Sequence, residues 1–310
     1  MLGLVSWNVR YFSHRTRGIT STQFNLHQIA QELAGMETQP HLIALQEIDD
    51  FSVRSAVGRI RSRQRLGQSH SQLDRFVEQL NLQSSRKGGR TYRSVFFPAH
   101  GHNKTYPLIS TGLAVLYSSD LQLWDHNGNQ PFHITHYRHP SMYGVKQTRI
   151  CGWCRFRTSD QQEFDVYNTH LSLPAFLGRA KGPTGGRFGE ADNQLFEVNK
   201  VIECIKERGG IERSLLVGDF NARPGSRVYN QIIGNMAYRD AHADYLGLGA
   251  HQMSQMPSAG FMAMRFRLDH VFSGAGIRFT DFSNTHPYGA DHPWGALSDH
   301  SPIIGNFDLA

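Results

Sequence analysis

The sequence has no long apolar run, few cysteines and few lysines. No apolar stretch approaches the roughly 20 residues that span a bilayer. The first residues, Met-Leu-Gly-Leu-Val-Ser-Trp, resemble a β-strand and not a basic segment followed by a long apolar one. We therefore expect neither a transmembrane segment nor a secretory signal peptide. Three cysteines in 310 residues do not make a disulfide framework, so the reducing cytoplasm is the expected compartment.

Lysine is scarce, but the chain is basic because of its arginines. Lysine and arginine total 32 and the formal net charge is +6, with a sequence pI near 9.3. The planar guanidinium group of arginine suits phosphate. The charge therefore favours a polyanionic partner, either nucleic acid or an anionic membrane surface. An ordinary basic protein is the alternative.

The hydrophobic pattern predicts a globular α/β fold. Hydrophobic residues make up 39% and charged residues 19% of the chain, which excludes global disorder. We expect strands at residues 3–9, 42–46, 91–97, 112–117, 149–157, 164–169, 214–217, 268–272, 277–281 and 303–307, and helices at 24–33, 72–80 and 194–207. Strands come both as neighbours and separated by helices, so a layered sandwich is expected. Polar residues flank both the first and the last strand, which predicts one domain over residues 1–310.

The strongest local signal is the stretch 215–222, which reads Leu-Leu-Val-Gly-Asp-Phe-Asn-Ala. Alternation in an extended chain puts Asp219 and Asn221 on one face. The acid can bind a hard cation or orient a water molecule, and the amide can donate to an oxygen on which charge develops. An Asx-turn that ends a strand is the alternative.

A second signal precedes the last strand, where residues 297–302 read Leu-Ser-Asp-His-Ser-Pro. Asp299 can serve a metal ion, and His300 can serve a phosphate or a water molecule. A histidine with a carboxylate partner is usual for acid–base chemistry near neutral pH. Asp269, at the end of another apolar run, is a candidate partner. A structural Asp–His pair is the alternative.

Three weaker signals also place polar side chains beside apolar runs. Glu47 directly follows the run 42–46, and Mg²⁺ needs only one or two protein carboxylates. Asn8 lies in the first run, and Asn168 and His170 share a face by alternation. Each of these alone could merely satisfy backbone groups.

The order of these motifs carries a resemblance. Ser-Trp-Asn, Leu-Gln-Glu, Asn-Thr-His-Leu, Gly-Asp-Phe-Asn, Leu-Asp-His and Ser-Asp-His-Ser-Pro follow one another between Ser6 and Pro302. Over nearly the whole chain the sequence resembles the endonuclease/exonuclease/phosphatase (deoxyribonuclease I-like) superfamily. The resemblance implies a four-layered α/β sandwich with two packed mixed β-sheets flanked by helices, and a divalent-metal-dependent phosphoesterase.

The resemblance also implies roles for these residues. Mg²⁺, with Mn²⁺ as a possible substitute, would be held by Glu47, Asn8 and Asp299. Catalysis would use Asp219 to orient or deprotonate water, Asn221 to hold the phosphate, His300 paired with Asp269, and His170 on the phosphate and leaving oxygen. Asn168 and Arg223 are expected to bind substrate.

The substrate class stays open at this level. Basicity and arginine content favour nucleic acid, cleaved by metal-assisted in-line attack of water. The alternative is a lipid or inositol-phosphate phosphoesterase, similar to sphingomyelinases or 5-phosphatases, although the apolar stretch 174–176 is too short for a membrane-inserting loop. The Asn-Thr-His-Leu form argues against abasic-site endonucleases. The filled motif positions argue against a catalytically inactive scaffold. We expect a monomer.

Other signals point away from a second site. Cys151 and Cys154 have the spacing of a redox or zinc motif but lie in an expected strand, where residues three apart face opposite sides, so a chelate is not expected. The arginine-bearing stretch 52–69 and the glycine-bearing stretch 174–189 are expected loops that either line a substrate groove or are solvated. A polar loop after residue 131 is expected to hold His133, His136 and His139.

Overall fold

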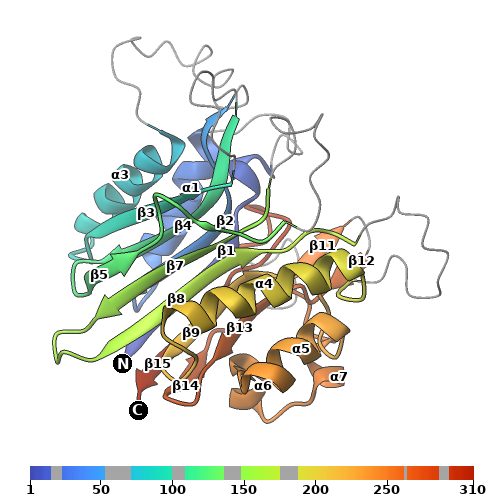
Figure 1. The fold of residues 1–310 in the computed structure, drawn as a ribbon. Helices are drawn as coiled ribbons and strands as arrows, with labels where there is room; N and C mark the ends of the chain where they lie inside the picture. The colour runs from blue at the N-terminus through green and yellow to red at the C-terminus, as the bar shows by residue number, and fades with distance from the viewer. Residues whose placement is uncertain are drawn as a thin grey trace.

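The computed structural model describes residues 1–14, 23–52, 71–99, 109–135, 148–174, 188–261, 264–285 and 293–310. They form two large mixed sheets packed face to face, with helices on both outer sides (Figure 1). This confirms the predicted fold class: two mixed sheets flanked by helices in four layers. The expected loops at 52–69 and 174–189, and His136 and His139, lie almost wholly outside the described residues.

The first sheet contains both ends of the chain. Its strand order is β14 (Ile277–Phe282), β15 (Ile303–Leu309), β1 (Leu2–Asn8), β2 (Leu42–Ser52), β4 (Ile109–Ser118) and β3 (Tyr92–Pro98). Among the described strands of this sheet only β1 and β2 run parallel; the other neighbours are antiparallel. The helices α1 (Gln23–Gly35) and α3 (Gln72–Ser85) lie on its outer face (Figure 1).

The second sheet repeats this plan. Its order is β10 (Arg239–Asp240), β13 (Asp269–Ser273), β9 (Ser214–Asp219), β8 (Glu163–His170), β7 (Ile150–Arg157) and β5 (Gln122–His126), with β6 (Phe132–His133) also paired to β7. Here β8 and β9 are the parallel pair. The remaining elements are η1 (Arg10–Phe12), α4 (Asp192–Arg208), α5 (Arg227–Met236), α6 (Ala241–Leu246), α7 (Ala250–Met253) and the hairpin β11 (Ala259–Phe261) with β12 (Met264–Phe266).

Strand alternation sorts the apolar side chains into separate layers. In β2, Leu42 and Ala44 belong to the cluster between the two sheets, whereas Ile43 and Leu45 belong to the cluster under α1 and α3. A third cluster lies between the second sheet and α4 and α5. Because both faces of the central strands are buried, their sequences are nearly continuous apolar runs.

All thirteen elements expected from the sequence are present, with longer ends in several cases. Ser71 caps α3 as expected, with its side chain accepting from the Asp74 N–H. Cys151 and Cys154 belong to different core clusters, which confirms that they face opposite sides of β7. The prediction of a polar loop at His133 is wrong, because this residue belongs to β6 and pairs with Ile150 of β7.

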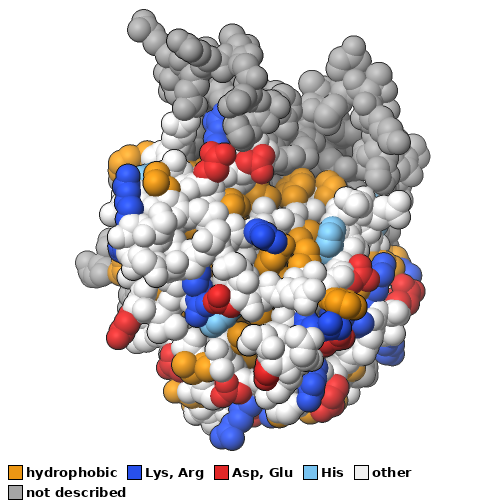
Figure 2. All heavy atoms as spheres, turned by 90° about the vertical axis from the view of Figure 1, so that its left-hand side faces the viewer, with side chains coloured by type: hydrophobic (Ala, Val, Ile, Leu, Met, Phe, Trp, Pro, Cys, Tyr) orange, Lys and Arg blue, Asp and Glu red, His pale blue; other side chains and the backbone are white. Residues whose placement is uncertain are grey.

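The sequence interpretation missed α5, although the signal was present. Ser226 caps this helix, and Val228, Tyr229 and Ile232 are buried at helical spacing behind it. No helix in the described part of the chain is long and apolar enough to cross a membrane. On the face shown in Figure 2, acidic and basic side chains are interspersed, so the net positive charge does not form a continuous patch there.

Candidate active site at the sheet edge

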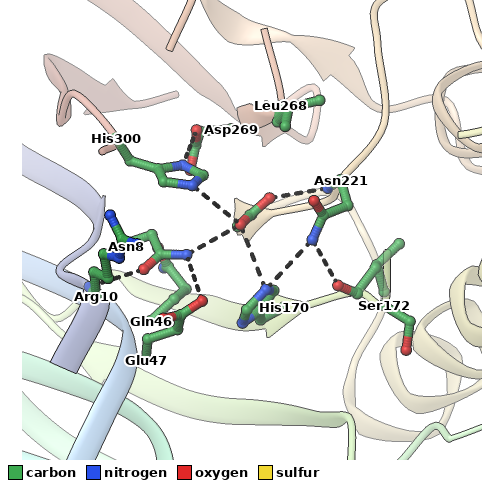
Figure 3. Close-up of polar contacts among 12 residues, drawn as sticks. Asn8, Arg10, Gln46, Glu47, His170, Ser172, Asn221, Leu268, Asp269 and His300 are labelled. Carbon is green, nitrogen blue, oxygen red and sulfur yellow. Dashed lines mark hydrogen bonds and ion pairs between the residues drawn. The ribbon is translucent and has the colours of Figure 1, made fainter. Parts of the chain in front are cut away.

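The candidate residues meet because the two parallel strand pairs end at the same edge of the sandwich. Asn8, the last residue of β1, pairs with Gln46 where the parallel pairing of β1 with β2 ends. His170 pairs with Asp219 at the end of β8 and β9, and Asp269 begins β13 opposite Asp219. Figure 3 shows side chains from both sheets converging on one point.

Asp219 is the centre of the cluster. Its Oδ2 accepts from Asn8 Nδ2 at 3.1 Å and lies 3.4 Å from His170 Nε2 and 3.8 Å from His300 Nε2. Its Oδ1 accepts from the backbone N–H of Asn221 at 2.9 Å. Burial raises the pKa of Asp219 to about 7, because the charged form is poorly solvated. The carboxyl group is therefore poised to exchange a proton near neutral pH.

Asn221 reaches the site by a turn and not by strand alternation. β9 ends at Asp219, and Asn221 has the left-handed φ of 47°. Its Nδ2 donates to the Leu171 carbonyl at 2.9 Å and lies 3.4 Å from His170 Nε2. The expectation of an extended chain through residue 221 is therefore wrong. The chain makes an Asx-turn at Asp219, and this turn still brings the Asn221 side chain into the site. Position 218, just before this turn, requires glycine, because a Cβ there would lie 1.9 Å from the Thr169 carbonyl oxygen.

His300 forms an ion pair with Asp269. The distance from His300 Nδ1 to Asp269 Oδ2 is 2.8 Å, and Ser258 Oγ donates to the same oxygen at 2.6 Å. Burial alone would lower the pKa of His300, but the negative charges of Asp269 and Asp219 outweigh it and raise the pKa to about 10. Trp7 Nε1 donates to the His300 carbonyl at 2.8 Å and so fixes its backbone. The ring is a positive charge directed at Asp219.

His170 is the opposite case. Burial lowers its pKa well below 6.5, and the positive charges of Arg149 and His300 lower it further. At neutral pH the ring is therefore uncharged and offers a single N–H. A neutral imidazole is a weak acid, so its N–H is better suited to a hydrogen bond to the phosphate; protonation of the leaving oxygen by His170 stays a prediction.

Glu47 lies at a bulge inside β2, not at the end of the strand. The pairing of β2 with β4 shifts between residues 45 and 48, and Glu47 has a φ of 55°. Burial raises its pKa, and the negative charge of Asp299 raises it further. Asp299 itself pairs with Arg10, with 2.9 Å between Oδ2 and Nη1. The two carboxylates therefore act on each other in one region of the site, and the bulge redirects the Glu47 side chain.

Asn8 links a carboxylate of the first sheet to a carboxylate of the second. Its Nδ2 donates to Glu47 Oε1 at 3.3 Å and to Asp219 Oδ2 at 3.1 Å. Its Oδ1 accepts from the backbone N–H of Arg10 at 3.0 Å. The amide is thus a hydrogen-bonded bridge between carboxylates, and only the second lone pair of Oδ1 is left for a metal ion.

The donor set around Glu47 and Asp299 fits a hard divalent cation. Carboxylate and amide oxygens are the ligands that Mg²⁺ prefers, and a cation there would relieve the repulsion that raises the pKa of Glu47. Asp219, Asp269 and His300 also offer ligand atoms within 4.8 Å of one another. We assign no cation to this second group, because His300 is protonated and already directs its ring nitrogens at both carboxylates.

Asn168 does not line the site. Its side chain is fully buried and its Nδ2 donates to the carbonyls of Leu45 and Ala114, both at 3.1 Å. Its Oδ1 accepts from Gln46 Nε2 at 2.8 Å. The substrate-binding role is therefore wrong: this amide is saturated by bonds that join the two sheets, and it is inaccessible to a ligand.

Arg223 lies two residues beyond Asn221 and is exposed. Its guanidinium is 4.5 Å from the ring centroid of Phe266, which in turn packs against Phe188 at 5.0 Å. Phe266 pairs with Ala259, and Ala259 forms a bridge with His300, so this stack borders the site through the β11–β12 hairpin.

Two residues with contacts in the site were missed from the sequence. Arg149 is half-buried with its Nε 3.4 Å from Ser172 Oγ, and its positive charge acts on both His170 and Glu47. Ser258 accepts from the N–H groups of Leu268 and Asp269 while it donates to the latter's carboxylate. Neither stands in a motif, so only the folded chain reveals them.

Comparison with known proteins gives a family match and a likeness of fold. The family model described as Endonuclease/Exonuclease/phosphatase family matches residues 5–300. The structures that resemble the chain include the human Nocturnin catalytic domain with bound sulfate (16% identity, 100% of this chain and 93% of that one, TM-score 0.59). They also include ANGEL2, a 2',3'-cyclic phosphatase (13% identity, 99% and 95%, TM-score 0.61).

A third similar structure is a mannosyl-6-phosphatase from Bacteroides thetaiotaomicron (18% identity, 100% of both chains, TM-score 0.59). At these identities the likeness concerns the fold. No curated protein matches the chain in sequence.

Proposed function

Because this chain belongs to the Endonuclease/Exonuclease/phosphatase family, whose members are phosphoester hydrolases that depend on a divalent metal, we propose that it is a Mg²⁺-dependent phosphodiesterase acting on nucleic acid. The observation that carries the proposal is the arrangement around Asp219. A carboxyl group with a pKa near 7 faces a protonated His300 on one side and the Glu47–Asp299 pair on the other.

In this reaction a water oxygen attacks phosphorus while the ester P–O bond breaks on the opposite side. Asp219 accepts the proton of the attacking water, which its pKa of about 7 allows at neutral pH. The leaving oxygen takes a proton from solvent. His300 holds Asp219 in place and its positive charge, maintained by Asp269, offsets the negative charge that develops on the phosphate.

Asn221 and His170 serve the non-bridging oxygens. Asn221 Nδ2 and His170 Nε2 lie 3.4 Å apart beside Asp219, and both side chains lie apart from His300 in Figure 3. Asn221 can offer its amide N–H, and His170 its single ring N–H, to an anion. Mg²⁺ or Mn²⁺ held by Glu47 and Asp299 would supply further positive charge to the phosphate. Arg10 and Arg149 add fixed cations on the rim.

Nucleic acid is favoured over other phosphoesters by the stack beside the site. The guanidinium of Arg223 covers one face of Phe266, and planar cationic groups of this kind stack on bases and pair with phosphates. The net charge of +6 supports a polyanion. Of the structures named above, one is a 2',3'-cyclic phosphatase and another is a mannosyl-6-phosphatase, so substrates of both kinds belong in the test.

The test is a substrate panel run with Mg²⁺, with Mn²⁺ and with a chelator. It should contain single-stranded DNA, duplex DNA, RNA, a 2',3'-cyclic nucleotide, a mannose phosphate, sphingomyelin and an inositol polyphosphate. We expect metal-dependent cleavage of a nucleic acid. Cleavage confined to the lipid or the inositol phosphate would support the alternative substrate class, and no metal-dependent cleavage of any member would refute the proposed activity.

The metal site has its own test, by calorimetry with Mg²⁺. Glu47→Gln should weaken Mg²⁺ binding by at least about tenfold, because it removes a charged ligand at nearly constant volume. Glu163→Gln is the matched control, since Glu163 pairs with Arg157 at the far end of β8. Equal affinity in both variants would exclude Glu47 as a ligand.

A further inference from the structure

A second aspartate–histidine pair lies behind the site. His270 follows Asp269 in β13 and therefore points to the other face of the second sheet. Its ring is fully buried, and its partner Asp240, at the end of β10, is 3% exposed. The mechanism above uses neither residue, so their burial needs a reason of its own.

The ring of His270 has an acceptor at each nitrogen. Nε2 lies 2.9 Å from the carbonyl oxygen of Ala222, and Nδ1 lies 3.4 Å from Asp240 Oδ2. A carbonyl and a carboxylate only accept, so both bonds form together only when each ring nitrogen carries a hydrogen. The carboxylate of Asp240 then balances the charge of the ring.

Asp240 is held in turn by backbone and hydroxyl donors. Its Oδ1 accepts from the N–H groups of His242 and Ala243 at the start of α6, both at 3.1 Å. Its Oδ2 also accepts from the hydroxyl of Tyr229 at 3.1 Å. The rings of Phe220, Tyr229 and Phe272 surround His270 with centroids within 5.8 Å. The imidazole therefore has one position.

That position supports the turn that carries Asn221. The carbonyl of Asp219 accepts from the N–H of Leu171 at 2.9 Å, and the carbonyl of Asn221 accepts from Gln194 Nε2 at 2.8 Å. The next carbonyl, that of Ala222, accepts from His270. A non-glycine residue with positive φ persists only where its surroundings hold it, and these bonds fix Asn221 from both sides.

We propose that His270, held by Asp240, is a positioning residue that fixes the Ala222 carbonyl and thereby sets Asn221 and its N–H bond to Asp219 in the geometry of the reaction. This inference rests on the proposed function. Because a displacement of about 1 Å can cost about 100-fold in rate, a single backbone tether of this kind has a measurable effect on catalysis.

The experiment compares three variants on bis(p-nitrophenyl) phosphate with Mg²⁺, below the melting temperature of each. His270→Phe keeps a ring but has no donor, and should lower kcat about 10- to 100-fold with KM within about twofold. His270→Gln restores a donor near the position of Nε2 and should return kcat to within about fivefold of wild type. Tyr229→Phe is the control: it keeps the ring that packs on His270 and removes only the hydroxyl bond to Asp240, which keeps its backbone donors, so kcat should not change.

A second readout does not depend on activity. The backbone N–H of Asn221 bonds to Asp219 Oδ1, so its hydrogen exchange should be faster in His270→Phe than in wild type and His270→Gln. If the wild-type protein cleaves no substrate, the proposed function fails. The hydrogen exchange of the Asn221 N–H still tests whether His270 fixes this turn. Equal losses in the Phe and Gln variants, or unchanged exchange in the Phe variant, would overturn the inference. His270→Leu, which is smaller, replaces His270→Phe if that variant does not fold.

Discussion

Two aspartate–histidine pairs lie on opposite faces of β13, and they use the same side chains differently. Asp269 pairs with His300 at 2.8 Å in the site, whereas Asp240 pairs with His270 at 3.4 Å behind it. Around Asp240 every oxygen has donors from backbone or hydroxyl groups. In the site, Asp269 Oδ1 is buried without a hydrogen-bond partner among the described residues.

The pKa values of the central aspartates follow this difference. Burial raises the pKa of Asp219 to about 7, because the opposing charge of His300 and the hydrogen bonds it receives do not compensate for lost solvation. Burial would raise the pKa of Asp240 too, but the bond and charge of His270, with the charge of Arg267, lower it to about 2. One cluster keeps a reactive carboxyl group at a cost in stability, and the other contributes stability. The comparison predicts that substitution of Asp219 acts mainly on activity, whereas substitution of Asp240 acts mainly on the stability of the fold.

The largest effect should come from Asp219→Asn. The variant loses the group that accepts the proton of water, so hydrolysis should fall by about 100- to 10,000-fold, the range for a general base. The melting temperature at pH 8 should stay level or rise, because a poorly solvated charge is removed. Steady-state kinetics and a thermal melt test both parts. A variant that unfolds while wild type is stable would show that the cluster is structural.

Asp269→Asn should have the next largest effect and should change the pH profile. We expect a loss of about 10- to 100-fold, as when a supporting carboxylate is removed from a functional imidazole. In wild type, activity should rise as Asp219 deprotonates near pH 7 and fall above about pH 10 as His300 loses its proton. Without the negative charge of residue 269 the pKa of His300 drops, so the alkaline limb should move to lower pH. An alkaline limb that does not move would refute the pairing.

Substitutions in the Asp240–His270 cluster behind the site should change the stability of the fold. The pKa of Asp240 is about 2 in the folded chain against an ordinary value of 3.8. Its ionised form therefore stabilises the fold above about pH 4, and this contribution is lost as the pH falls through 2. Asp240→Asn should lower the free energy of unfolding by about 2 kcal/mol at pH 7. Denaturant titrations at several pH values should show the deficit closing towards pH 2; a deficit independent of pH would contradict the assignment.

The smallest effect should come from Tyr229→Phe. This change removes one hydroxyl bond to Asp240, which keeps its other donors. The expected loss is about 1 kcal/mol, the net value of a buried hydrogen bond. Activity at a temperature well below the melt should not change. A large loss of activity here would mean that the Tyr229 hydroxyl, and not His270 alone, is needed to position Asn221.

Local patterns in the sequence predicted the fold class and most strands, because strands buried on both faces need nearly continuous apolar runs. The strand ends were less predictable. Glu47 was expected after a strand and lies at a bulge within it, and Asn221 was expected in an extended chain and lies in a left-handed turn. Both side chains reach the site because a positive φ redirects them, and no periodicity in the sequence encodes that. Three statements stay predictions: residues 1–310 form one domain, the protein is a monomer, and it lies in the cytoplasm.

The identity of the chemical groups was thus determined by the sequence. Asp219, His300 and Glu47 stand in motifs whose residue types suit phosphoester chemistry, and their order along the chain carried the resemblance to the family. What each group does was decided by the tertiary structure. Asn168 and His170 stand in the same motif and on the same face of one strand. Asn168 nevertheless joins the two sheets, whereas His170 faces Asp219. Role depends on burial, charge and partners, and these come from residues far apart in the chain that only folding brings together.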